Sequence, residues 1–138
     1  MIAAIVALLQ ADATLLALLI GGVHRAQEIS RQTTPTAYDS NKEIKPCVLV
    51  KQETATPWGV YQDSGRLYIV LYFYERSGYA SIEAARMLVY SLLHRSQVSP
   101  VGGGGCYEIR HESDVLDQED PTLGAAMVVS RYVATIQR

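Results

Sequence analysis

The chain has 138 residues, of which 49% are apolar and 19% charged, with a formal net charge of −2 and a pI of about 5.9. A chain of this length and composition fits a single domain, residues 1–138, with its own core, and long disorder is excluded. Its Lys and Arg residues are scattered, so the sequence offers no basic face of the kind that neutralises nucleic-acid phosphates.

The first twenty residues are apolar and are long enough to span a bilayer. Asp12 near the centre opposes insertion, and no Lys or Arg precedes the apolar run to form the charged start of a signal peptide. We therefore expect two helices here, with Asp12 as the N-cap of the second and Gly21-Gly22 ending it. Apolar side chains lie on more than one face of both predicted helices, so we expect each helix to be buried on more than one side.

A polar stretch, residues 30–45, has loop chemistry without apolar periodicity, and residues 46–50 then read as a strand. Trp58 lies in a predicted turn at 57–59, with a possible short strand at 60–61. Residues 63–65 are predicted as another turn.

Residues 66–75 form the clearest strand pattern, because two kinds of side chain alternate along it. One face is aliphatic with a single Phe, and the other carries Tyr68, Tyr72 and Tyr74 around Val70. Tyrosine rings favour burial while their hydroxyls need a partner or water, a combination common at subunit interfaces. We predict that a neighbouring subunit covers this tyrosine face; the alternative is that the first helices cover it within the chain.

An amphipathic helix is predicted from Ser81 to about residue 97, with Ser81 or Ser77 as its cap. A glycine-rich connection, 98–105, then leads to a strand at 106–111, an acidic loop at 112–120 and a last strand at 123–137. This order predicts an α+β fold: a mixed or antiparallel sheet with an N-terminal helical segment and one long amphipathic helix packed on it.

No catalytic or metal-binding pattern emerges from the sequence. The glycines at 102–105 precede a strand, whereas a phosphate loop leads into a helix. The three histidines and the two cysteines, Cys47 and Cys106, lack metal-site spacing, and no signature supports a Cys–His nucleophile. Both cysteines lie in or beside strand-like runs and are expected to be buried thiols of a reducing compartment. We predict that the protein is not an enzyme and that it binds no cofactor or metal.

Several segments together resemble a known family. They are the apolar opening at 2–15, the Gly-Gly stop, the polar loop, the strand at 46–50 and the strand at 67–75 followed by the helix at 81–94. The chain closes with Asp120-Pro121-Thr122-Leu123-Gly124 and a strand containing Ser130-Arg131-Tyr132-Val133. In order and length this resembles the small tail-completion proteins of long-tailed bacteriophages, the tail terminators and related neck proteins. The glycine run and the Trp58 turn are not features of that family.

The resemblance implies a structural virion protein that forms a ring, expected to be a hexamer. The ring would cap the tail tube protein, dock the head connector and let genomic DNA pass without specific binding. It would lie in the neck of the virion after folding in the host cytoplasm. A head-completion or adaptor protein of the same neck is the first alternative, and a membrane-anchored accessory protein is the second.

Four carboxylates cluster in the predicted acidic loop: Asp114, Asp117, Glu119 and Asp120. A calcium loop would need a central glycine and a closing glutamate, and both are missing at their positions. The plain interpretation is a solvated loop. We predict instead that these four residues lie at a subunit contact or at the lumen of the ring.

Overall fold

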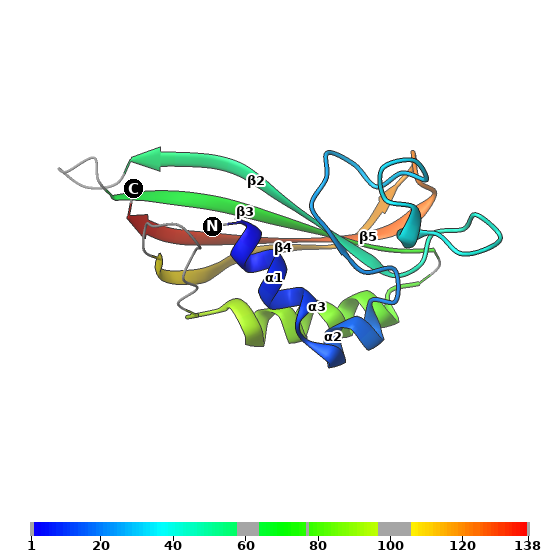
Figure 1. Ribbon diagram of the computed structural model, residues 1–138, viewed down its shortest axis with the longest axis horizontal. Helices are drawn as coiled ribbons and strands as arrows, with labels where there is room; N and C mark the ends of the chain where they lie inside the picture. Colours follow the sequence, from blue (N-terminus) through cyan, green and yellow to red (C-terminus); the bar gives the residue numbers. More distant parts are fainter. Residues whose placement is uncertain (1, 58–63, 77, 97–105, 138) are drawn as a thin grey trace.

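The computed structural model describes residues 2–57, 64–76, 78–96 and 106–137 (Figure 1). Its helices are α1 (Ile2–Gln10), α2 (Ala13–Leu18), the 3-10 helix η1 (Pro35–Ala37) and α3 (Ala80–Leu93). Its strands are β1 (Val23–His24), β2 (Cys47–Pro57), β3 (Ser64–Glu75), β4 (Cys106–Asp120) and β5 (Ala125–Gln137).

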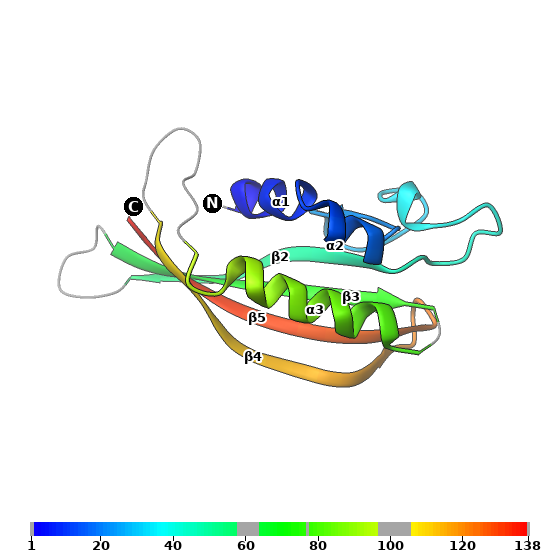
Figure 2. The ribbon, with the colours of Figure 1, turned by 90° about the horizontal axis from the view of Figure 1, so that it is seen from below.

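The five strands form one mixed sheet in the order β1-β2-β3-β5-β4. Only the short β1–β2 pair is parallel, and the other three pairs are antiparallel. All three α-helices pack on the same face of the sheet, α1 and α2 toward the β1–β2 side and α3 toward β5 and β4 (Figures 1 and 2). The predicted α+β class, with an N-terminal helical segment and one long amphipathic helix on a mixed sheet, is confirmed.

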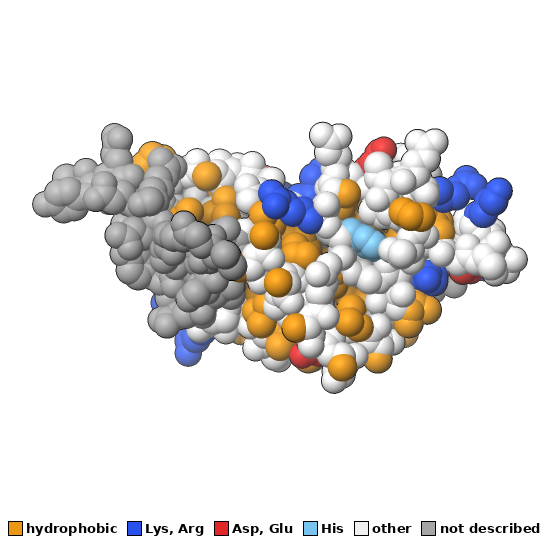
Figure 3. All heavy atoms as spheres, viewed as in Figure 1, with side chains coloured by type: hydrophobic (Ala, Val, Ile, Leu, Met, Phe, Trp, Pro, Cys, Tyr) orange, Lys and Arg blue, Asp and Glu red, His pale blue; other side chains and the backbone are white. Residues whose placement is uncertain are grey.

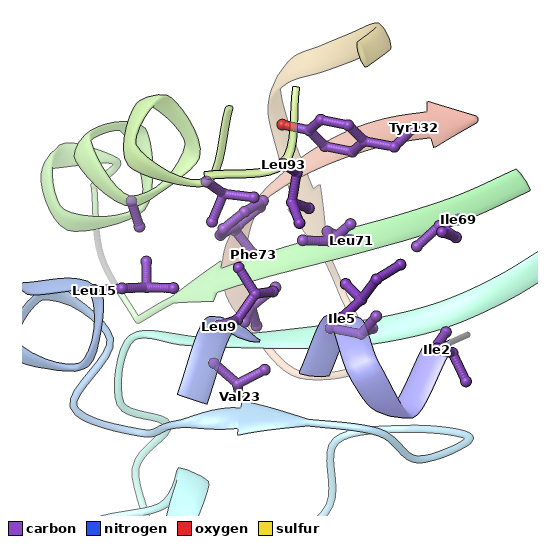
Figure 4. Packing of buried hydrophobic residues seen from close by; sticks show 14 of the residues in the cluster. Ile2, Ile5, Leu9, Leu15, Val23, Ile69, Leu71, Phe73, Leu93 and Tyr132 are labelled. Atoms are coloured by element: carbon purple, nitrogen blue, oxygen red, sulfur yellow. The ribbon is translucent and has the colours of Figure 1, made fainter. Parts of the chain in front are cut away.

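The alternation of β3 sets the layers of the molecule. Its aliphatic face, with Ile69, Leu71 and Phe73 all fully buried, points to the helices. There it meets Leu9 of α1, Leu93 of α3 and Tyr132 of β5 in one continuous core, whose side chains converge between helices and sheet in Figure 4.

The two predicted N-terminal helices are confirmed, and Asp12 caps α2 by accepting a hydrogen bond at 2.8 Å from the backbone N–H of Leu15. The expected burial on more than one side is wrong, because α2 buries only Leu15 and leaves Leu16 37% exposed. The turn that follows needs its glycines. Gly22 has a φ of +89°, and a Cβ on Gly21 would lie 2.8 Å from the carbonyl oxygen of Pro46. No helix in the described ranges has the length and apolarity required to cross a membrane.

A second, smaller core lies on the opposite face of the sheet, where the segment between β1 and β2 folds back across it. Ile29, Ala37 and Ile44 of this segment pack against Cys47 and Tyr74. The polar stretch predicted as a loop is therefore a cover for the sheet. Burial raises the pKa of the Cys47 thiol to about 12, which keeps it protonated and unreactive.

The acidic loop predicted at 112–120 is wrong: these residues continue β4, paired with β5 from Cys106↔Ile136 to Asp120↔Ala125. The strand takes three register irregularities, and Asp117 has a φ of +53°. Bulges and charged side chains are typical of an edge strand, which explains why its sequence looks like a loop.

Other boundaries also move. Strand β2 runs on to Pro57, well past residue 50, and Ser64 and Gly65 begin β3 instead of forming a turn. Helix α3 ends at Leu93, because His94 is extended and Arg95 has a φ of +64°. The turn and short strand predicted at 58–61 and the connection at 98–105 lie outside the described residues.

Candidate subunit interface

The three tyrosines of β3 lie along the face away from the helices, and their surroundings differ from one end to the other. Tyr74 is 5% exposed and belongs to the second core, under the segment between β1 and β2. Tyr72 is half-buried at the margin of that core. Tyr68, further along β3, is half-buried and belongs to neither core. The first helices pack on the other face and cover none of the three.

The register places Tyr68 in a cross-strand row with Thr54 of β2, Val133 of β5 and, beyond it, Arg110 of β4. This row, which we call the open row, carries no covering segment in the described residues (Figure 1). The neighbouring row contains an ion-pair contact of 3.6 Å between Arg131 and Glu53, both exposed. The sheet therefore presents a mixed aromatic and charged surface at the end away from the second core.

The four acidic residues predicted at a subunit contact or at the lumen of the ring have different surroundings along β4. Asp114 points to the helix side, where Arg86 of α3 donates a 2.9 Å hydrogen bond to one carboxylate oxygen and Ser130 of β5 donates a 2.6 Å bond to the other. Asp120 accepts bonds from the backbone N–H groups of Thr122 and Leu123 in the β4–β5 turn. Asp117 and Glu119 are exposed at the sheet edge.

Asp114 is the centre of a polar cluster that no sequence pattern indicated. Burial alone would raise the pKa of its carboxyl, but the Ser130 and His111 contacts and the Arg86 charge outweigh burial and lower it. His111 Nε2 lies 3.0 Å from the carboxylate, and its backbone N–H donates to His94 Nδ1 at 3.0 Å. No spacing in the sequence indicates this ion pair, because Arg86 and Asp114 lie 28 residues apart on different elements.

Ser130, Asp114 and His111 are the residue types of a nucleophilic triad, but their spatial arrangement differs from that of a triad. In a triad the histidine lies between serine and aspartate, so that it can take the hydroxyl proton. Here the aspartate lies between the other two, and Ser130 is fully buried with its hydroxyl donated to the carboxylate. The cluster therefore joins α3 to the sheet. The described residues also contain no group of three His, Cys, Asp or Glu side chains arranged to hold a metal ion.

A groove of about 500 Å³ lies above this cluster, between α3 and β4. Arg86, His111 and Asp114 contribute its polar part, and Met87 and Tyr90 contribute apolar side chains that are 64% and 43% exposed. Tyr90 stacks on His94, with ring centroids 4.7 Å apart. Large apolar side chains exposed around a groove are typical of a protein contact surface.

The fold is similar to that of a chain in a solved structure, the virion of a native gene transfer agent particle. The TM-score is 0.75 at 15% sequence identity, and the match covers 99% of this chain and 93% of that chain. No protein-family model matches the sequence, and no significant match exists among curated proteins.

Asp114→Asn tests the polar cluster. Because the folded-state pKa of Asp114 is lowered, its carboxylate adds stability above the unfolded value near 3.8, and this part is lost as pH falls through the folded value. The variant should lose about 2 kcal/mol of unfolding free energy at pH 7 and should show a shallower decline below pH 4 in urea titrations. Glu119→Gln, at the exposed edge, is the control. Identical acid profiles for the two variants would contradict this assignment.

Tyr74→Ser and Tyr68→Ser separate the two ends of the tyrosine face. Loss of the buried Tyr74 ring should cost about 3 kcal/mol of unfolding free energy, whereas the half-buried Tyr68 should cost about 1 kcal/mol or less. Tyr68→Ser should instead weaken association with a partner, measured as the mass from light scattering or as incorporation into particles. Equal melting temperatures for the two variants would show that the segment between β1 and β2 does not hold Tyr74.

Proposed function

We propose that the chain is a structural subunit of a phage-like virion, acting as the tail terminator: a ring, expected to be a hexamer, that caps the tail tube and joins it to the head connector. The observation that carries this proposal is the similarity of fold, over nearly the full length of both chains, to a chain of the gene transfer agent virion. The sequence order resembles the tail-completion proteins independently.

The surfaces of the molecule support assembly as its mode of action. Strand β4 has no strand on its outer side among the described residues, the open row on the far face lacks a cover, and the α3–β4 groove exposes Met87 and Tyr90. A monomer gains nothing from these exposed apolar groups, whereas a subunit of an assembly buries them.

The proposed mechanism is steric. Copies close into a ring through a heterologous contact, in which two different patches of the chain meet around the axis. One rim of the ring matches the tail tube and ends its growth, and the other rim docks the head connector. A chain with net charge −2 suits a lumen through which DNA slides, because a basic lumen would hold the phosphates. In this proposal Tyr68, Asp117 and Glu119 are contact residues, whereas Tyr74, Asp114 and Asp120 hold the surface in shape.

Deletion of the gene for this chain from the genome that encodes the virion tests the tail-terminator role. Without a terminator the tube has no stop, so electron micrographs should show tails of uncontrolled length and separate heads. Complementation with the wild-type gene should restore tails of one length joined to heads. Tails of normal length beside unjoined heads would contradict the terminator role and assign the chain to head completion.

A further inference from the structure

The α2–β1–β2 side of the molecule combines apolar and basic groups. Ile20 projects from the corner between α2 and β1 and is 61% exposed, and Leu16 of α2 is 37% exposed. On the β1–β2 edge, Arg25 and Lys51 line a shallow hollow of about 300 Å³ over Val50, where the chain leaves β1. Figure 3 looks onto this side: hydrophobic side chains gather over the α1–α2 region, Lys and Arg side chains lie above them, and little acidic surface is visible. We call this the basic side.

The hollow on the basic side is lined by two cationic residues, Arg25 and Lys51, and by no Asp or Glu residue. Strand β4, at the opposite edge of the sheet, has the reverse balance, with six acidic residues and one Arg. Among the acidic ones, Glu112, Asp117 and Glu119 are exposed. Together with the groove between α3 and β4, they form what we call the acidic side. Charge is thus polarised across the width of the sheet.

Each of the two sides also exposes the kinds of residue that are typical of one partner's surface in a protein interface. A specific contact buries about 1,200–2,000 Å² in total, usually with apolar groups at the centre and charges at the rim. The acidic side places Met87 and Tyr90 in its groove, with the carboxylates along the edge. The basic side exposes Ile20 and Leu16, and Arg25 and Lys51 line its hollow.

The strand directions fit contact between opposite sides. Along β2-β3-β5-β4 every pair is antiparallel, and β1 is parallel to β2, so the outermost strands β1 and β4 run in opposite directions. When successive copies stand side by side, β4 of one copy faces the β1–β2 edge of the next in the antiparallel sense. The bulges and charged side chains of β4 disfavour backbone pairing of its edge with another strand. The contact between copies is therefore made by side chains.

We propose that the acidic side of one copy binds the basic side of the next, and that this contact repeats around the ring. Ile20 and Leu16 of one copy pack against Met87 and Tyr90 of its neighbour. Arg25 and Lys51 face the carboxylates of β4. Two acidic sides would bring like charges together, which disfavours a two-fold dimer through β4. The inference rests on the proposed ring and names the two surfaces that close it.

Charge reversal tests the contact. The first variant, R25E/K51E, makes both sides acidic, and the second, E112K/E119K, makes both sides basic. Arg25 and Lys51 are outside the buried core, and both glutamates are exposed, so circular dichroism melting should be close to wild type. R31E/K42E has the same charge change as the first variant, lies at another hollow and serves as the matched control.

Wild type and control should form rings by light-scattering mass, and each reversed variant alone should associate at least about tenfold more weakly. An equal mixture of the two variants should recover rings, because alternating copies restore an acidic surface against a basic one at every contact. The four substitutions in one chain should also recover rings.

Three results would overturn the contact. In one, R25E/K51E assembles normally while E112K/E119K does not, which indicates a two-fold contact of acidic sides. In the others, the folded mixture stays monomeric, or wild type stays a monomer at about 1 mM. The experiment uses the purified chain without tails or heads. If the mixture of variants recovers rings but the gene deletion leaves tails of normal length, the contact stands and only the terminator role is contradicted.

Discussion

The central strand β3 is apolar on both faces, and the rest of the molecule depends on how each face is covered. The helices cover one face completely, with Ile69, Leu71 and Phe73 fully buried. The segment between β1 and β2 covers the other face only at the Tyr74 end. This unequal cover leaves part of the sheet exposed beside an edge strand, and exposed sheet faces and edges of this kind are typical of protein contact surfaces.

Local signals in the sequence predicted the elements that local interactions determine. The Asp12 cap, the alternation of β3 and the apolar stripe of α3 are all confirmed. Each depends on residues that are only a few positions apart in the sequence. The first part of β4, residues 106–111, was predicted as a strand, but residues 112–120 were not, because their hydrogen bonds come from β5 and their own side chains are those of a charged loop. The cover over Tyr74 escaped prediction for the same reason: residues 30–45 have no periodicity, and their packing partners lie far along the chain.

The candidate interface shows the same division. Alternation along residues 66–75 indicated the tyrosine face and clustering indicated the four carboxylates, but the side of the sheet to which each side chain points depends on register. A bulge in β4 turns Asp114 toward Arg86, while Asp117 and Glu119 remain outside. The charge difference between the two edges of the sheet emerges only once β1 and β4 are known to be the outermost strands. The distribution of charge across the folded chain therefore says more about assembly than its net charge of −2.

The most direct measurement of the central claim is an electron cryomicroscopy reconstruction of the assembled chain, alone or in its particle. We expect a closed ring in which the α3–β4 groove of every copy lies against the α2–β1 corner of the next. We also expect the open row around Tyr68 to remain available for the tail tube or the head connector. A two-fold dimer through β4, or a ring whose copies leave both the groove and the corner in solvent, would contradict this claim.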